Sequence, residues 1–233
     1  MHVPDGFLDA PTSIATGVAA AGAVALCLRG ARRELDDRTA PLAGIVAAFV
    51  FAAQMLNFPV GAGTSGHLLG GALAAALVGP WTGALCVAVV LVVQALVFAD
   101  GGLTALGTNV LLMAICTVIV SYGVMRLLVA ALPRRRGSIL VAVCGGALLS
   151  VPSAAALFVG LYAVGGAVAV PLPSLAGAML TVHVLIGLGE ALITSLVVGT
   201  VLATRPDLVF IARSLRTPLE RRRAGAPADE VSA

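Results

Sequence analysis

The chain has no lysine, few aromatic residues and little charge of either sign. All fourteen of its basic residues are arginine, and only 11% of its 233 residues are charged and 4% aromatic. A soluble globular domain carries about 25% charged residues, so the composition excludes a typical soluble protein. Apolar residues make up 60% of the chain, and the mean hydropathy is +1.07. The sequence therefore predicts an integral membrane protein.

The missing lysine excludes a further class of protein. The Walker A motif, G-x-x-x-x-G-K-[ST], places a lysine on the phosphates of ATP. No such motif can occur in a chain without lysine. We therefore expect no ATPase activity from this chain. Its few basic residues also do not form the broad basic surface that binds nucleic acid.

Long apolar runs indicate how the chain crosses the membrane. A transmembrane helix needs about 20 predominantly apolar residues, with some latitude in length. The runs lack the alternation of a membrane β-barrel. We therefore predict an all-α bundle of about seven transmembrane helices. The predicted segments cover residues 12–28, 41–57, 67–79, 81–98, 108–131, 138–163 and 175–203.

The arginines are distributed unevenly along the chain. Thirteen of the fourteen lie in three patches, within residues 29–38, 134–136 and 205–223, and the loops on the other predicted side contain none. Loops rich in basic residues stay on the cytoplasmic side. We therefore predict an extracellular N-terminus and a cytoplasmic C-terminus. Residues 1–203 would form the membrane domain, and residues 204–233 a basic, disordered cytoplasmic tail.

The third predicted segment is short and follows an irregular stretch. Residues 57–66, NFPVGAGTSG, contain too many glycines and prolines for a regular helix. Non-helical backbone at membrane depth occurs only where protein or water satisfies it. We therefore expect residues 57–66 to form a loop that dips into the outer face, and His67 to lie at the start of the short helix.

The first two residues can chelate a metal ion. The amine of Met1, the deprotonated amide of His2 and the Nδ1 atom of its imidazole can bind one divalent ion in fused chelate rings. One position of a square plane is then left for a second imidazole, and His67 is on the same predicted side. Square-planar nitrogen coordination favours Ni(II) or Cu(II). The alternative is that His2 is an incidental surface residue.

Other polar residues are candidates for supporting roles. His183 and Glu190 are seven residues apart, on one face of the last segment. Ionisable residues inside a span are functional candidates, and the alternative is that they fix interior packing. Asp100 could orient a ligand histidine, unless it belongs to a solvated turn. The other candidates for supporting the loops around the metal are Asn57, Ser65 and Asn109.

Five stretches, collinear along the chain, resemble one known family. They read MHVPDGFLDAP, NFPVGAGTSGHLLGG, GPW, QALVFADGG and HVLIGLGEALIT. Over roughly residues 1–200 the chain is similar to the CbiM/NikM family, the substrate-specific membrane components of energy-coupling factor (ECF) transporters for cobalt and nickel. The resemblance implies a seven-helix component whose N-terminus is inserted into the bundle. It also implies a metal ion bound by the Met1 amine, the His2 amide and imidazole, and the His67 imidazole.

The resemblance implies partners as well. Such a component works in the cell membrane with a transmembrane coupling protein, two cytoplasmic ATPase subunits and often a small accessory membrane subunit. It implies no cofactor beyond the transported Co(II) or Ni(II), and no nucleic-acid partner. Ala15, Ala19 and Ala23 form a small-x-x-x-small ladder that permits close packing, within the bundle or against a partner. The ladder resembles the surface that such components offer to the coupling protein.

Two other functions are compatible with parts of the sequence. One is an autonomous channel or carrier for divalent metal ions, although the seven segments do not divide into the similar halves typical of many carriers. The other is an intramembrane serine protease of the rhomboid type. In that case Ser65, within the sequence GTSG, would be activated by His183 as its base.

Overall fold

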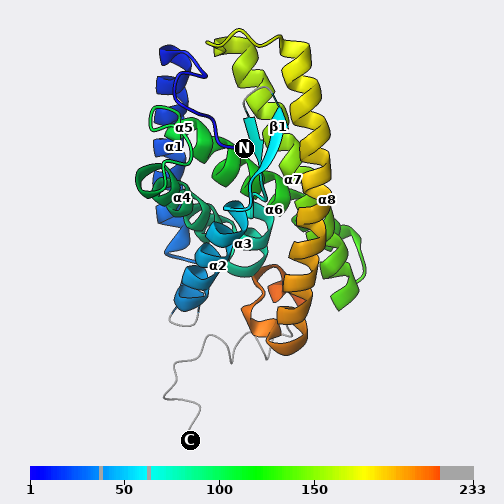
Figure 1. Ribbon diagram of the computed structural model, residues 1–233. Helices are drawn as coiled ribbons and strands as arrows, with labels where there is room; N and C mark the ends of the chain where they lie inside the picture. The colour runs from blue at the N-terminus through cyan, green and yellow to red at the C-terminus, as the bar shows by residue number, and fades with distance from the viewer. Residues whose placement is uncertain (37–38, 62–63, 216–233) are drawn as a thin grey trace, which may run out of the picture.

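Apolar helices form nearly all of the structure (Figure 1). The computed structural model describes residues 1–36, 39–61 and 64–215, without the side chains of residues 58–65, 214 and 215. The helices are α1 (Ala10–Ala31), α2 (Thr39–Gln54), α3 (Gly71–Val78), α4 (Pro80–Val97), α5 (Leu106–Asn109), α6 (Thr117–Ala131), α7 (Arg136–Gly165) and α8 (Leu172–Thr204). A π-helical stretch, η1 (Val110–Cys116), joins α5 to α6. The predicted helical bundle is confirmed, apart from one short β-hairpin.

Each of the seven predicted segments contains a helix, but the helices differ in length. Five are long and apolar enough to cross a membrane, namely α1, α4, the continuous stretch Leu106–Ala131, α7 and α8. By contrast, α2 has 16 residues and α3 only eight. Five candidate spans are therefore established among the described residues, and the number seven stays a prediction.

The predicted start of the third helix is wrong. The helix begins at Gly71, so His67 lies four residues before it and not at its first turn. The reason is local: Gly70 adopts a left-handed conformation with φ of 78°, and a Cβ atom at this position would collide with Val50 of α2. The segment 67–70 is therefore a connection without regular secondary structure.

The stretch before His67 is more regular than the sequence suggests. Phe58–Gly61 (β1) and Thr64–Gly66 (β2) pair as an antiparallel hairpin in which Phe58 is opposite Gly66. The irregular loop expected at residues 57–66 is therefore replaced in part by two short strands. The pairing satisfies backbone groups that would be costly to leave unpaired beside apolar helices.

Helix α3 lies at the centre of the bundle. All eight of its residues are buried, and it contacts α2, α4, α6 and α7. A helix that is apolar on every side is stable only when neighbours surround it. This explains how so short a helix can be part of a membrane protein.

The chain after α8 folds back onto the bundle. Two short 3₁₀ helices, η2 (Pro206–Leu208) and η3 (Phe210–Leu215), follow α8, and Val209, Ile211 and Ala212 are buried. The first part of the predicted disordered tail is therefore folded. Its remainder, residues 216–233, lies outside the described residues.

The arginine-rich connections gather at one end of the bundle, the lower end in Figure 1. There the buried carboxylate of Glu34 accepts hydrogen bonds from the backbone N–H groups of Trp81 and Thr82, at 3.3 and 2.7 Å. A carboxylate at a helix N-terminus is favoured by the helix dipole. This contact ties the connection between α1 and α2 to the start of α4.

Candidate metal centre

The first three residues are inserted into the bundle. Met1 and Val3 are each 2% exposed, and Figure 1 shows the N-terminus in the middle of the molecule, beside β1. Asn109 holds Val3 on both sides: the Val3 N–H donates to Oδ1 at 2.8 Å, and Nδ2 donates to the Val3 carbonyl at 3.2 Å. The N–H of Gly102 donates to the same carbonyl at 2.9 Å.

A turn at Asp5 and Gly6 brings the chain back to the start of α1. Gly6 has a φ of 74°, a backbone conformation that glycine adopts readily in a turn. The Asp5 carboxylate accepts hydrogen bonds from the hydroxyl of Thr104, at 2.5 Å, and from its backbone N–H, at 2.7 Å. These bonds lower the pKa of Asp5. The turn is thus fastened to the connection between α4 and α5.

The segment after the turn is fixed against α7. The ring centroid of Phe7 lies 5.7 Å from that of Phe158 and 5.4 Å from that of Tyr162. The N–H of Asp9 donates to the carbonyl of Gly165 at 2.7 Å. Residues 1–9 are therefore held by contacts at both ends and at the turn between them.

Two imidazole rings meet at the inserted terminus. The rings of His2 and His67 are stacked, with centroids 4.7 Å apart and planes 29° apart. The Nδ1 atom of His67 lies 2.8 Å from the carbonyl oxygen of Leu68. A carbonyl only accepts hydrogen bonds, so Nδ1 carries the proton and Nε2 keeps a free electron pair. This Nε2 atom is buried and has no hydrogen-bond partner among the described residues.

Asp100 lies beside the Nε2 atom of the His2 ring. Its Oδ2 atom lies 3.5 Å from Nε2 of His2, without hydrogen-bond geometry, so the contact is electrostatic. A carboxylate there favours the tautomer that carries the proton on Nε2, which leaves Nδ1 as the electron-pair donor. Gly101 makes room for this ring: a Cβ atom there would lie 3.0 Å from Nδ1, and its φ is 96°.

Burial keeps the donors of the N-terminus neutral. It lowers the pKa of the Met1 amine to about 4, with a smaller opposite effect from Asp100. Burial, and next the positive charge of the Met1 amine, lowers the pKa of His2 to about 3. Above about pH 5 both groups therefore carry free electron pairs. A metal ion can use such pairs directly, because its ligands must be deprotonated.

Side chains alone do not make a metal site here. No group of three His, Cys, Asp or Glu side chains among the described residues could hold a metal ion. A four-nitrogen site at this place therefore needs the amine of Met1 and the amide of His2 in addition to the imidazoles of His2 and His67. The buried, unpartnered Nε2 of His67 fits this donor set.

The connection that carries His67 is held by residues whose role could not be defined from the sequence. The carboxylate of Glu190, in α8, accepts hydrogen bonds from the N–H groups of Leu69 and Gly70 at 2.7 and 3.1 Å. Nε2 of Gln54, in α2, donates to the Leu69 carbonyl at 2.7 Å. Glu190 thus positions the connection after His67. Its place inside a span was the one sequence signal for this role.

His183 also lies near the centre. Its Nδ1 atom is 2.7 Å from the carbonyl oxygen of Met179, and its buried Nε2 atom has no hydrogen-bond partner among the described residues. His183 thus lies within electrostatic range of the Met1 amine and of His67.

The remaining predicted site residues lie elsewhere or are not described. Asn57 is exposed and directly precedes Phe58, which is opposite Gly66 in the hairpin, so its supporting role near His67 stays a prediction. Ser65 belongs to β2, but its side chain lies outside the described part of the structure. On α1, Ala15 and Ala19 are exposed and Ala23 is half-buried.

Comparison with known proteins identifies the family. The model of the family CbiM, described as the cobalt uptake substrate-specific transmembrane region, matches residues 2–208. The chain belongs to the CbiM family. This CbiM-family chain is 40% identical to a putative metal transport protein of Haloquadratum walsbyi, over 90% of this chain and 94% of the relative.

Other relatives of this CbiM-family chain carry more specific names. A putative fused nickel transport protein NikMN of Archaeoglobus fulgidus is 44% identical, over 90% of this chain and 68% of its own length. Cobalt transport protein CbiM 1 of Pelobacter propionicus is 34% identical, over 87% of this chain and 91% of its own length. A crystal structure of a transition metal transporter matches with a TM-score of 0.81 at 28% identity, covering 93% of this chain and 100% of that one.

The absence of lysine provides a direct test of the inserted terminus. The α-amine is the only primary amine of this sequence, so an amine-reactive ester labels nothing else efficiently. We expect no labelling of the native protein and complete labelling after unfolding, measured by mass spectrometry. Gly102→Val should expose the amine to labelling, because a side chain there would overlap with the backbone of Asp5. Gly123→Val, where nothing lies within 4 Å, is the control. Rapid labelling of the native protein would contradict the insertion.

Proposed function

We propose that this CbiM-family chain is the substrate-specific component of an ECF-type importer, and that it captures Co(II) or Ni(II) from outside the cell. One observation supports this above all. The chain's own N-terminus is buried and neutral, and its His2 ring stacks on His67, whose Nε2 atom has no hydrogen-bond partner among the described residues. Membership of the family supports the same substrate class, and the names of the relatives from Archaeoglobus fulgidus and Pelobacter propionicus mention nickel and cobalt.

In this proposal four nitrogens bind the ion. The Met1 amine, the His2 amide and the His2 Nδ1 atom form two chelate rings, and Nε2 of His67 completes the plane. Asp100 orients the His2 ring, and Asn109 holds the residue that follows it. His183 supplies a further imidazole beside the donors. Such a planar nitrogen site favours Ni(II) or Cu(II) over Co(II) on intrinsic grounds.

The orientation in the membrane follows from the two ends of the bundle. The inserted N-terminus contacts the connection between α4 and α5 and the end of α7, whereas the arginine-rich connections lie at the other end (Figure 1). By the positive-inside rule the arginine end faces the cytoplasm. The metal centre then opens toward the outside of the cell membrane, where it takes up its substrate.

Partners would supply the energy for transport. The chain without lysine has no Walker A motif, so we assign ATP hydrolysis to two cytoplasmic ATPase subunits and its transmission to a transmembrane coupling protein. A small accessory membrane subunit completes the assembly. Of the five candidate spans α1 is the least buried, and its exposed alanines, Ala15 and Ala19, permit the close approach of a partner helix.

A residue placed before Met1 tests the donor set. It converts the amine into an amide and inserts bulk into a closed space. We expect the Kd for Ni(II) or Co(II), measured by calorimetry on the purified protein, to rise at least about 100-fold, since outer contacts alone change metal affinity 10- to 100-fold. His67→Ala should have a similar effect. Ser65→Ala should bind as the wild type does; an unchanged Kd for the extended chain would disprove the chelate.

The pH dependence of binding follows from the lowered pKa values. Because the pKa of the Met1 amine is about 4 and that of His2 about 3, both groups are neutral at pH 6 and release no proton to the metal. Only the His2 amide does so. Calorimetry in two buffers should therefore show about one proton released per ion at pH 6, and affinity should fall about tenfold per pH unit as pH decreases. With the ordinary pKa values nearly three protons would be released.

Transport by the chain alone separates the proposed importer from an autonomous channel or carrier. We expect vesicles that contain only this protein to bind about one metal ion per protein molecule and to accumulate no further metal. Addition of the coupling protein, the ATPase subunits and ATP should produce repeated uptake, followed with radioactive metal. Sustained uptake without the partners would favour the channel or carrier instead.

A further inference from the structure

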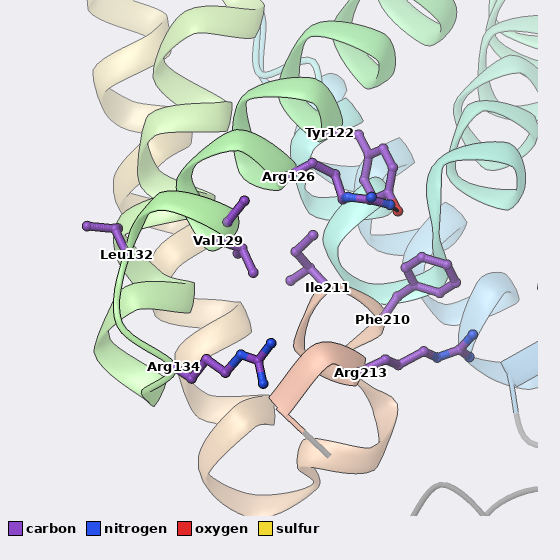
Figure 2. Close-up of a pocket in the computed structure, with 9 residues that line it drawn as sticks. Tyr122, Arg126, Val129, Leu132, Arg134, Phe210, Ile211 and Arg213 are labelled. Carbon is purple, nitrogen blue, oxygen red and sulfur yellow. Dashed lines mark hydrogen bonds between the residues drawn. The ribbon is translucent and has the colours of Figure 1, made fainter. Parts of the chain in front are cut away.

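One arginine does not belong to any of the three patches. Arg126 lies within α6, five residues before its end at Ala131, or about 7 to 8 Å along the helix axis. In the structure it is not isolated. It lines a pocket of about 540 Å³ together with Arg134, from the connection between α6 and α7, and Arg213, from η3 (Figure 2). The odd arginine therefore joins members of two separate patches at one place.

Aromatic rings position two of these guanidinium groups. The Arg126 guanidinium carbon lies 5.9 Å from the centroid of the Tyr122 ring, and its Nη1 atom lies 3.5 Å from the Tyr122 hydroxyl. The guanidinium carbon of Arg213 lies 4.3 Å from the centroid of the Phe210 ring. The two rings are themselves neighbours, with centroids 6.3 Å apart. Guanidinium groups held in this way present their planar N–H donors in a shape that suits phosphate.

The rest of the pocket is apolar. Val129, Leu132 and Ile211 line it beside the arginines, and Figure 2 shows the Arg134 side chain extending from its connection beneath Ile211. No carboxylate is among the described residues that line the pocket. Its volume is in the range of small-molecule sites, about 300 to 1,000 Å³. It can therefore take a ligand that carries negative charge at one end and hydrocarbon at the other.

We propose that this pocket binds the headgroup of an anionic phospholipid, such as phosphatidylglycerol or cardiolipin. The pocket lies where the apolar part of α6 gives way to an arginine-rich connection, which is the depth of lipid phosphates. Basic pockets between transmembrane helices are known to bind such headgroups. An acidic protein segment fits less well, because Arg126 lies inside the apolar helix, where lipid reaches and a polar peptide would be desolvated.

The bound phosphate also has a structural consequence. It would bridge α6 and η3, two elements that meet beside Tyr122 and Phe210, and would hold the folded part of the C-terminal segment on the bundle. The inference does not depend on the metal centre. It uses the proposed orientation only to assign the lipid to the cytoplasmic leaflet.

Native mass spectrometry of the whole protein tests the proposal. The protein is released from nanodiscs that contain equimolar phosphatidylglycerol and phosphatidylcholine, and the retained lipids are counted. We expect the wild type to retain phosphatidylglycerol preferentially. Arg126→Gln and Arg213→Gln should each lower its retention about fivefold, the change expected for one interfacial arginine. Arg135→Gln is the matched control. The substitution removes one charge from the connection that carries Arg134, but Arg135 itself does not line the pocket.

Four results would overturn the proposal. The first is a wild type that retains both lipids equally, and the second is an Arg135→Gln variant that loses as much lipid as Arg126→Gln. The third is displacement of the lipid by millimolar inorganic phosphate. The fourth is that the arginine variants lose binding of an acidic partner protein while their lipid retention is unchanged. Metal titration of the same variants should give the wild-type Kd, which shows that they are folded. Absence of metal binding by the wild type would instead contradict the proposed function. The lipid measurement would still test the pocket, because it does not depend on metal binding.

Discussion

Burial of the chain's own amino terminus is the constraint on which the rest of the site depends. An exposed α-amine is charged at neutral pH, and moving that charge into an apolar interior is costly. The protein avoids this cost because the amine loses its proton, as its lowered pKa indicates. The same change converts it from a cation, which repels metal ions, into a nitrogen with a free electron pair. In the proposed site, desolvation of Met1 would thus make a ligand out of a chain terminus.

The short central helix creates the space for this terminus. Helix α3 has eight residues and so covers only about 12 Å, whereas the hydrocarbon core of a membrane is about 30 Å thick. The rest of that depth, before α3 begins, is filled by the hairpin, by the connection that carries His67 and by residues 1–3. These pieces lack the internal hydrogen bonds of a helix. The side chains of Glu190, Gln54 and Asn109, from the surrounding helices, form hydrogen bonds with their backbone instead.

The fold was predictable from the sequence where local patterns determine it. Long apolar runs gave the helices, and the chelating chemistry of Met1 and His2 indicated the partner His67 without any periodicity. The start of α3 was missed because it depends on one glycine that fits against Val50, a contact across the bundle. The role of Glu190 was missed because it binds Leu69, 121 residues away in sequence. The folded segment at 206–215 contains one apolar run, LVFIA, which is too short to show a helical period.

In the proposed function, release of the ion would have to oppose contacts that the structure shows. The proposed donors include the first two residues, and the next residue, Val3, makes three hydrogen bonds with Asn109 and Gly102. Thr104 holds Asp5 by two more. Each hydrogen bond contributes about 1 kcal/mol net, so these contacts hold the segment by only a few kcal/mol. These bonds add to the packing of Phe7 against Phe158 and Tyr162. In the proposed function, a partner that draws the segment away from His67 would break the plane of nitrogens while the helices of the bundle stay in place.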